Sequence, residues 1–377
     1  MAPSVTVLTP SVTDDAAWMT VALTLARRGL GRTSPNPAVG CVLVRDGRAV
    51  GRGWTGDGGR PHAETEALRR AGQSSHGATA YVSLEPCNHR GQTPPCTEAL
   101  IAAGVRRCVV AMMDPDTRVA GQGVTHLRER GVDVTLGVGR EAAERFYGAY
   151  VRHRREGRPG ITLKLATTLD GRIATRGGES QWITGDAARA EAHRLRATHD
   201  AVMVGSGTAV VDNPRLSVRL PGLESVRPVR VVVDGRLRLP LTHNLVSGAA
   251  EHPTLLITRP DAPRDRRVAY EAAGVQVIEA PLGEQATLST RGIAQVLGEH
   301  GLTRVLVEGG SGLAAGLFSA DLVDDVVWFR APRVIGGDGL GAIGSFGLDR
   351  LASTPSFTLW ESRAVGTDIM ETYRRSI

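Results

Sequence analysis

The feature that most constrains this chain is an alternation of short apolar strand patterns with helix patterns, which runs twice along 377 residues. The first run covers 38–150 and begins with a predicted hairpin whose tight turn is Asp46-Gly47. Helix patterns such as HAETEALRRAG and TEALIAAG then alternate with strand patterns, and each helix pattern ends near a glycine. This order predicts an α/β fold built in layers.

A second α/β unit follows the segment EGRPG at 156–160, which has the composition of a linker. It opens with ITLKLATTLDGRIA and continues through strand patterns such as AVMVGS, RVVVDG, TLLITR and RVLVEGG. Because 377 residues exceed what one core usually serves, we expect two domains. Their predicted ranges are 14–155 and 160–377.

The basic charge of the chain, with a net +6 and a pI near 9.6, suggests an anionic partner. Of the 45 basic residues one is a lysine and the other 44 are arginines, which are scattered except in VRHRREGR at 151–158. A nucleic-acid surface would concentrate them with aromatic residues, which make up only 4% of the chain. A small phosphorylated substrate suits the charge equally well, although a compositional bias toward arginine explains it without any partner and is the interpretation we prefer.

The N-terminal sequence does not have the pattern of a secretory signal, because its apolar run AAWMTVALTLA follows two aspartates and no basic region. The run is too short to span a bilayer and predicts an amphipathic helix that begins at Asp14 and Asp15 and stops at Gly29. Four cysteines in so long a chain argue against a disulfide framework. We therefore expect a cytoplasmic protein that does not contact a membrane.

Two cysteines in LEPCNHRGQTPPC, Cys87 and Cys96, are candidate metal ligands because their spacing is not that of a C-x-x-C redox pair. The segment PHAETEAL supplies His62 as a third ligand and Glu64 two residues later. His-x-Glu followed by Pro-Cys and a second Cys is the arrangement of zinc nucleobase deaminases. In such a site the glutamate is not a ligand but carries a proton from water to the departing amine.

The local sequence agrees with a catalytic zinc site, and two other interpretations stand beside it. Pro61 places His62 at the start of a helix, and Cys96 opens another helix, where a thiolate is favoured. His-Ala-Glu is by itself an ordinary helix start, and His89 as a fourth ligand would make the site structural. Cys41 and Cys108, within apolar strand patterns, are expected to be core thiols.

The lone lysine of the chain, Lys164, lies in a strand pattern on the same face as Thr162 and Ala166. An amine is a compact donor that a guanidinium cannot imitate, and every other basic position of this chain is arginine. We therefore expect Lys164 to have a role in an active site.

Two glycine-rich turns follow strand patterns in the second half. RVLVEGGSGLAAGLF contains G-x-G-x-x-A from Gly310 to Ala315, and VMVGSGTAVVDNPRL offers a second such turn. Two such turns in one sheet could bind a dinucleotide, although Gly205 and Gly207 would equally serve a tight turn alone. A conventional Rossmann unit is not expected, because no acidic residue closes a following strand at the usual spacing.

Several motifs resemble the bifunctional riboflavin-biosynthesis deaminase/reductase family from about Asp14 onward. In the first half these are SPNPAVGCVLV, PHAE, EPCNHRGQTPPC and MMDPDTRVAGQG; in the second half they are LKLATTLDGRIAT, GESQWITG, VVDNPRLSVR, VVVDG and VEGGSGLAAGLF. The resemblance implies an α/β protein with an N-terminal cytidine-deaminase-like three-layer domain and a C-terminal dihydrofolate-reductase-like domain. It implies Zn2+ in the first and NADPH in the second. It also implies hydrolytic deamination of 2,5-diamino-6-(5-phosphoribosylamino)pyrimidin-4(3H)-one, then reduction of its ribosyl side chain to give 5-amino-6-(5-phosphoribitylamino)uracil.

The resemblance also assigns residues to each function. The residues implied to contact NADPH are Ala166, Trp182, Thr208, Asp212, Gly310, Ser311, Gly312, Leu313, Ala314, Ala315 and Gly316. The residues implied to contact substrate are Asn36, Ser180, Arg196, Leu216, Arg219 and Glu308. Lys164 and Glu308 are expected to polarise or protonate the ribose end, and Glu64 to act in deamination. Gln92 and Gly235 depart from the family pattern, where a basic residue and a serine are frequent.

Two alternatives remain: a nucleic-acid deaminase with an accessory domain, and a non-catalytic protein stabilised by zinc. The paired glycine-rich turns and dispersed charge speak against the first alternative. For the preferred function we expect a small phosphorylated pyrimidine as substrate, no nucleic-acid partner and a homo-oligomer.

Overall fold

The computed structural model describes residues 14–90, 94–116, 120–283 and 286–375. The chain divides into two compact units between Arg155 and Glu156, and each is described by itself.

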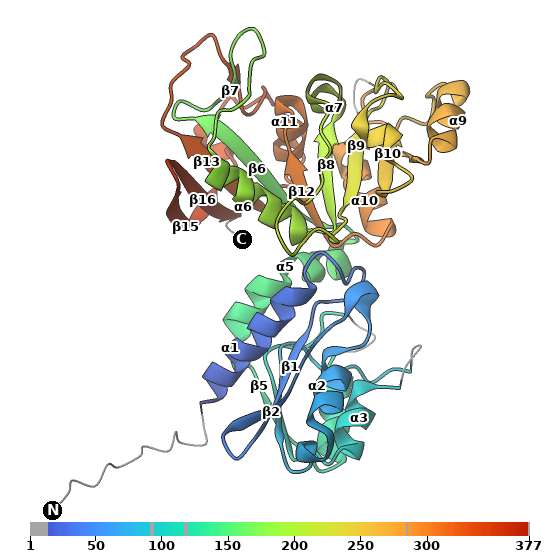
Figure 1. The fold of residues 1–377 in the computed structure, drawn as a ribbon, viewed down its shortest axis with the longest axis vertical. Helices are drawn as coiled ribbons and strands as arrows, with labels where there is room; N and C mark the ends of the chain where they lie inside the picture. Colours follow the sequence, from blue (N-terminus) through green and yellow to red (C-terminus); the bar gives the residue numbers. More distant parts are fainter. Residues whose placement is uncertain (1–13, 91–93, 117–119, 284–285, 376–377) are drawn as a thin grey trace, which may run out of the picture. The chain divides into compact units, whose positions relative to one another are not determined.

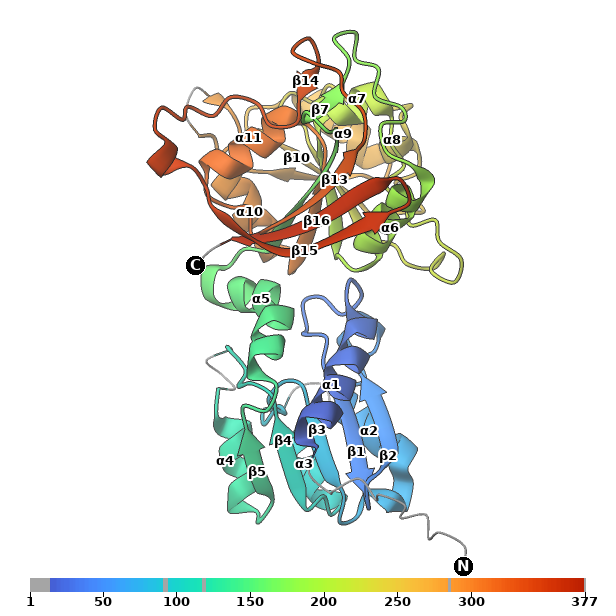
Figure 2. The same cartoon turned by 90° about the vertical axis from the view of Figure 1, so that its left-hand side faces the viewer.

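The N-terminal unit is built on a five-stranded sheet in the order β2-β1-β3-β4-β5 (Figures 1 and 2). Its first strand pairs antiparallel with β2 and β3, and β3, β4 and β5 run parallel. The strands are β1 (Gly40–Arg45), β2 (Arg48–Trp54), β3 (Thr79–Val82), β4 (Arg107–Val110) and β5 (Asp133–Leu136). The helices are α1 (Asp15–Ala26), α2 (Ala63–Ala71), α3 (Cys96–Ala102), α4 (Gln122–Glu129) and α5 (Arg140–Glu156), with short 3-10 turns η1 (Arg27–Gly29), η2 (Asp57–Gly59) and η3 (Gly72–Ser75).

Two apolar clusters, one on each face of the sheet, make this unit a three-layer sandwich. Cys41 and Leu43 of β1 point toward α2, α3 and α4, whereas Val42 and Val44 point toward α1 and α5. The alternation follows from the two-residue period of a strand, and it buries both faces of the strand. The cytidine-deaminase-like three-layer prediction is confirmed, and Cys41 and Cys108 are core thiols as expected.

Local sequence signals account for the ends of these elements. The Asp14 side chain accepts a hydrogen bond from Ala17 N at 3.0 Å and so caps α1. Asp46 and Gly47 both have positive φ, 50° and 72°, as the predicted tight hairpin turn requires. Gly53 of β2 lets α2 approach closely, because a Cβ there would lie 2.0 Å from the Ala63 carbonyl oxygen. The start of α2, which carries His62 and Glu64, is thereby held against the sheet.

The C-terminal unit contains a nine-stranded sheet in the order β11-β10-β9-β8-β12-β6-β13-β16-β15. The strands from β11 to β13 are parallel, and β16 and β15 extend the sheet antiparallel. These strands are β6 (Gly160–Thr168), β8 (Ala201–Gly205), β9 (Val229–Val233), β10 (Thr254–Thr258), β11 (Gln276–Glu279), β12 (Arg304–Glu308), β13 (Asp325–Ala331), β15 (Phe357–Val365) and β16 (Asp368–Arg375); β7 (Arg172–Ala174) and β14 (Leu340–Gly341) form a separate pair. The helices are α6 (Asp186–Ala197), α7 (Ser206–Asp212), α8 (Asn244–Ser247), α9 (Arg264–Ala272), α10 (Thr290–Glu299) and α11 (Ser311–Ser319), with the 3-10 turn η5 (Leu351–Ser353).

Helices cover both faces of this sheet, as Figures 1 and 2 show. Met203 of β8 packs with α10 and α11, whereas its neighbours Val202 and Val204 pack with α7 and α8. The same alternation places Lys164 of β6 and Glu308 of β12 on the face that α6 covers, because Leu163 and Val307 belong to the α10–α11 cluster. The α/β fold predicted for this unit is confirmed.

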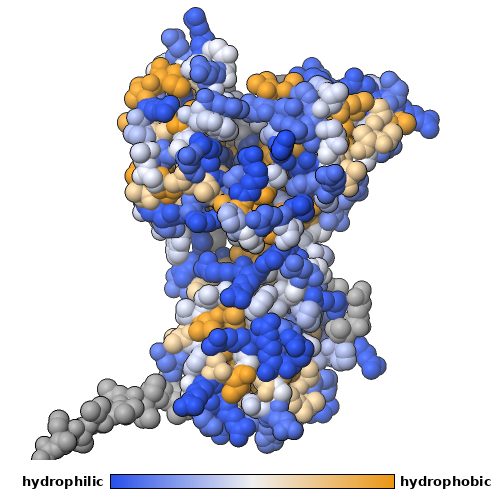
Figure 3. Space-filling model, viewed as in Figure 1, coloured by the Kyte–Doolittle hydropathy of each residue, from blue (hydrophilic) through white to orange (hydrophobic). Residues whose placement is uncertain are grey.

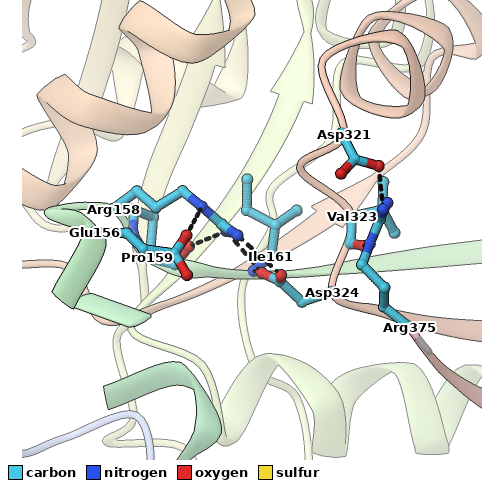
Figure 4. A network of polar contacts seen from close by, with 8 residues as sticks. All are labelled: Glu156, Arg158, Pro159, Ile161, Asp321, Val323, Asp324 and Arg375. Atoms are coloured by element: carbon cyan, nitrogen blue, oxygen red, sulfur yellow. Dashed lines mark hydrogen bonds and ion pairs between the residues drawn. The ribbon is translucent and has the colours of Figure 1, made fainter. Parts of the chain in front are cut away.

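A buried polar network fastens the first residues of this unit to its sheet (Figure 4). Arg158 donates from Nη1 and Nη2 to Asp324 at 2.8 and 3.1 Å, and its Nε donates to Glu156. Asp324 also accepts from Ile161 N at 2.8 Å. The side chains of Arg158 and Asp324 are only 12% and 7% exposed, so solvent screens this pair little.

The face of the molecule in Figure 3 is mostly hydrophilic, with its apolar residues in small separate groups. Among the helices that the structure describes, none combines the length and apolarity needed to cross a lipid bilayer.

The network of Arg158 predicts a large effect on stability. Asp324→Asn should lower the free energy of unfolding by about 3 kcal/mol, because it removes the buried counter-charge of Arg158 and leaves only the more exposed Glu156 beside it. For a unit of this size that is roughly 6–12 °C in Tm, to be measured by calorimetry of the full chain. The matched control is Asp321→Asn, which removes the carboxylate that pairs with Arg375 but is 65% exposed, and should change stability little. Equal losses in the two variants would contradict this account.

Candidate active sites

Three side chains from separate segments of the N-terminal unit converge on one point. His62 is the N-cap of α2, Cys87 lies in the loop after β3, and Cys96 is the first residue of α3. His62 Nδ1 lies 3.2 Å from Cys96 Sγ and 3.5 Å from Cys87 Sγ, and the three ligand atoms lie within 4.8 Å of one another. A tetrahedral zinc ion with ordinary Zn–N and Zn–S bonds places such atoms roughly 3.5 Å apart. The three residues therefore fit the predicted zinc site.

Of the two thiols in the cluster, Cys87 is the one that ionises more readily, whereas the sequence predicted this for Cys96. The first amide of α3, Cys96 N, donates to Cys87 Sγ at 3.4 Å, so the N-terminus of the helix faces the other sulfur. A side-chain hydrogen bond from Cys96 lowers the pKa of Cys87 to about 4, and the same interaction raises the pKa of Cys96. Both thiols release their protons when a divalent ion binds.

Glu64 lies beside the cluster and is 3% exposed. Burial is the main cause that raises its pKa to about 7, and the charge of Cys87 raises it further while His62 lowers it. A carboxyl group with a pKa near neutrality both accepts and releases a proton readily, which is the property of a general acid and base. The geometry thus suits the expected proton transfer.

These residues open into a pocket of about 130 Å³. Its lining includes Asn36, whose Nδ2 donates to the Gly59 carbonyl at 3.3 Å, as well as His62, Glu64 and Cys87. His89 also lines the pocket but does not belong to the cluster of three ligands, which weakens the four-ligand alternative. Gln92 lies outside the described residues.

Part of the wall of this pocket was not predicted from the sequence. Asp114 and Asp116 follow β4, and Tyr150 and Arg154 belong to α5. Tyr150 donates to Asp114 at 3.3 Å, Arg154 Nε lies 3.7 Å from Asp116, and burial raises the pKa of Asp114 to about 6. The sequence analysis used the motif MMDPDTRVAGQG only for its resemblance to the family. Its two aspartates, which follow a strand, were the signal that could have predicted this part of the pocket.

Glu85, which was also missed from the sequence, fixes that wall to the metal-binding loop. Its buried carboxylate lies two residues before Cys87 and accepts four backbone N–H groups. Oε2 accepts from Asp114 N at 3.2 Å and from Gly121 N at 2.9 Å. Oε1 accepts from Gly123 N at 2.9 Å and Val124 N at 3.2 Å. One carboxylate therefore satisfies the amides at the start of α4 and holds Asp114 in the pocket.

Glu85→Gln is expected to raise the KM of deamination at least tenfold and to leave the second unit unaffected. The amide keeps the shape but turns an NH2 group toward two backbone donors, each of which then lacks an acceptor. Deamination should be followed with zinc content measured in parallel. The control is Glu98→Gln, on the first turn of α3, whose partner is the His126 side chain. An unchanged KM in Glu85→Gln would show that the carboxylate does not hold the pocket wall.

In the C-terminal unit, parallel pairing brings Lys164 and Glu308 together. They are register partners on β6 and β12. Arg196 of α6 donates from Nε and Nη2 to the two oxygens of Glu308, at 2.6 and 2.8 Å. Burial alone would raise the pKa of Glu308, but Arg196 and then Lys164 lower it to about 2. Glu308 is therefore ionised at neutral pH.

Lys164 is the second cation beside Glu308. Burial lowers its pKa, while the nearby Glu308 raises it. Arg196 also donates from Nη1 to the Ser217 carbonyl at 2.9 Å, so its donors are largely occupied within the protein. Of the two arginines expected at the substrate phosphate, Arg219 is the exposed one.

The other residues assigned to this site lie in β6, in α7, in α11 and in the loops that follow β7, α7 and β12. Gly309 and Gly310 have φ of 93° and 91°, so the turn before α11 favours glycine, and a Cβ on either would lie within 3.5 Å of Thr208 Oγ1. Trp182 is 60% exposed beneath Arg189, and Leu216 is 2% exposed within an apolar cluster. The remaining assigned residues are Ala166 in β6, Ser180 after β7, Asp212 at the end of α7, and Ser311 to Gly316 in α11.

Comparisons with known proteins agree with both sites. A family model described as "RibD C-terminal domain" matches 159–370, and one described as "Cytidine and deoxycytidylate deaminase zinc-binding region" matches 12–112. The chain is 40% identical over 366 residues to "Riboflavin biosynthesis protein RibD" of Escherichia coli, covering 94% of this chain and 98% of the relative. It is 37% identical to the protein of the same name from Aquifex aeolicus, covering 96% and 98%.

Two solved structures are similar over nearly the whole chain. "Acinetobacter baumannii RibD, form 2" has a TM-score of 0.84 at 36% identity and covers 96% of this chain and 99% of that one. A Thermotoga maritima protein, a "diaminohydroxyphosphoribosylaminopyrimidine deaminase/ 5-amino-6-(5-phosphoribosylamino)uracil reductase", has a TM-score of 0.82 at 33% identity, with the same coverage.

Proposed function

The chain belongs to the RibD family of riboflavin biosynthesis proteins, and we propose from this how its side chains divide the family's two reactions. The protein is a bifunctional enzyme of riboflavin biosynthesis, a zinc-dependent deaminase and an NADPH-dependent reductase. One observation supports assigning one reaction to each unit. Each unit has its own group of buried titratable residues, around Glu64 in the N-terminal unit and around Lys164 in the C-terminal unit.

For deamination, the proposed metal ligands are His62, Cys87 and Cys96. When bound, the zinc ion supplies the Lewis acid that makes water nucleophilic near neutral pH. Glu64 accepts the proton of that water and delivers it to the departing amino group, so that a C–N bond is exchanged for a C–O bond and ammonia leaves. Asn36, across the pocket, offers an amide that can pair with the amide edge of a pyrimidine.

For reduction, NADPH supplies the hydride that the ribosyl carbon C1′ receives. Lys164 donates the proton to the ribose oxygen as the ring opens, because it is the group beside Glu308 that can both carry and release a proton. Glu308 favours the charged form of the amine, and Arg196 fixes the carboxylate of Glu308 in place. We place the nucleotide along the turns at Thr208 and Gly310–Gly316, with Ala166, Trp182 and Asp212 beside it. Ser180, Leu216 and Arg219 are proposed to contact the substrate, Leu216 through its backbone.

The proposed substrate is the phosphoribosylated diaminopyrimidine after which the Thermotoga protein is named. Its deaminated product becomes the substrate of the reductase unit. We further propose that the enzyme is a cytoplasmic homo-oligomer that acts without nucleic acid, with domains at 14–155 and 160–377. Ammonia release in nuclease-treated protein and sedimentation analysis test these points.

Glu64→Gln should abolish ammonia release, with a loss of at least about a hundredfold in kcat, because the amide cannot carry the proton. Zinc content should stay near that of the wild type, since Glu64 is not a ligand. NADPH oxidation with the deaminated pyrimidine as substrate should be unchanged, and it serves as the internal control. Wild-type ammonia release in this variant would contradict the proposed role.

Lys164→Met should lower NADPH oxidation at least about a hundredfold and leave ammonia release intact. Lys164→Arg separates charge from proton transfer, because a guanidinium keeps the charge but does not give up its proton. Both variants should be measured with the deaminated substrate, and with thermal unfolding as a check on folding. If Lys164→Arg oxidised NADPH at the wild-type rate, the lysine would act through its charge alone.

A further inference from the structure

Three adjacent strands of the reductase sheet, β12, β8 and β9, end in turns that touch one another in a row. Thr208, after β8, lies against Gly309 and Gly310, after β12. Arg238, in the loop after β9, donates from Nη2 to Ser206 Oγ at 2.7 Å and so joins the third turn to the second. In open parallel sheets, ligands bind in the crevice outside the carboxyl ends of the strands. A dinucleotide that begins above β6 and crosses β12 and β8 reaches the loop of Arg238.

Two ionisable residues of that loop could meet the adenosine end of a dinucleotide. An acidic residue there accepts a hydrogen bond from a ribose 2′-hydroxyl and favours NADH, whereas an arginine accommodates a 2′-phosphate and favours NADPH. Asp234 directly follows β9, and Arg238 lies four residues further along. The position of each side chain decides between the two possibilities.

Burial removes Asp234 from contact with a ligand. The residue is 1% exposed, and its Oδ2 accepts from Leu239 N at 2.8 Å within the loop. Its Oδ1 is buried, has no hydrogen-bond partner among the described residues, and lies 4.0 Å from Arg238 Nε. The carboxylate therefore shapes the loop and attracts the arginine from below, and it does not present an oxygen to a ribose.

Arg238 is the exposed member of the pair, at 60% of its side chain. Asp234 attracts its Nε, and its Nη2 donates a hydrogen bond to Ser206. Together these two interactions orient the guanidinium over the row of turns. A planar guanidinium binds phosphate oxygens in a fork and is pre-organised when one of its nitrogens is already held. Arg259, after β10, is less suitable because Asp261 occupies its Nε and Nη2.

We propose that Arg238 binds the 2′-phosphate of the cofactor and gives the reductase its preference for NADPH over NADH. The inference rests on the proposed reductase function and adds to it the residue that distinguishes the phosphorylated from the unphosphorylated nucleotide. The ligand group is a phosphomonoester on the adenosine ribose. Asp234 is a positioning residue for this contact.

The test measures binding without turnover, by calorimetric titration of the full-length protein with NADP+ and with NAD+. Arg238→Gln should weaken NADP+ binding about 10- to 100-fold, as expected for the loss of a charge-assisted contact, and leave NAD+ binding within about twofold. Arg236→Gln is the matched control, because Arg236 is an exposed arginine of the same loop. It should change neither affinity. The ratio of kcat/KM for NADPH and NADH should fall in Arg238→Gln by the same factor as NADP+ affinity.

Each other result overturns the proposal. Equal weakening of both nucleotides in Arg238→Gln would show that the arginine merely supports the loop, and unchanged binding would show that it does not touch the phosphate. A selective loss of NADP+ in Arg236→Gln alone would assign the contact to that residue. If the wild-type protein bound neither nucleotide, the proposed reductase function itself would be wrong. This outcome is distinguishable from a failure of the Arg238 proposal, because it appears without any substitution.

Discussion

Both catalytic units depend on carboxylates that are buried from solvent and held by partners from distant segments of the chain. Glu85 is paired with four backbone amides contributed by residues 114–124, and Glu308 with the fork of Arg196 and with Lys164. A buried charge is costly unless every partner is in place, so each carboxylate specifies the position of the segments around it. The reacting groups are thereby fixed before substrate arrives, which is what catalysis by orientation requires.

Backbone packing supplies the second constraint. Helix α2 can carry His62 and Glu64 into the pocket because Gly53 leaves no side chain between that helix and β2. In the other unit, Gly309 and Gly310 allow the turn before α11 to adopt positive φ and to lie against Thr208. A side chain at Gly53 would displace the helix, whereas a side chain at Gly309 or Gly310 would strain the backbone.

The sequence predicted those features that local chemistry determines. Periodicity located the hairpin at Asp46-Gly47 and the capped helix at Asp14, and the zinc ligands followed from the order of His62, Glu64, Cys87 and Cys96. The sequence did not predict which thiol the helix N-terminus would face, because that depends on how the loop before α3 folds back. Nor did it show that Glu85 pairs with four backbone amides, because these lie 29 to 39 positions further along the chain. The pairing of Glu308 with Arg196 was missed for the same reason, since the two residues are 112 positions apart.

The pairing of Glu308 explains why a chain with 44 arginines retains one lysine. Two cations face this carboxylate, and they differ in what they can do. A guanidinium does not lose its proton in a protein, so Arg196 can balance the charge of Glu308 and anchor it to α6 but cannot take part in proton transfer. An amine in the same buried place has a lowered pKa, and its single nitrogen can donate a proton and recover one. Replacing that lysine by arginine would preserve the positive charge and, under the proposed mechanism, remove the proton donor.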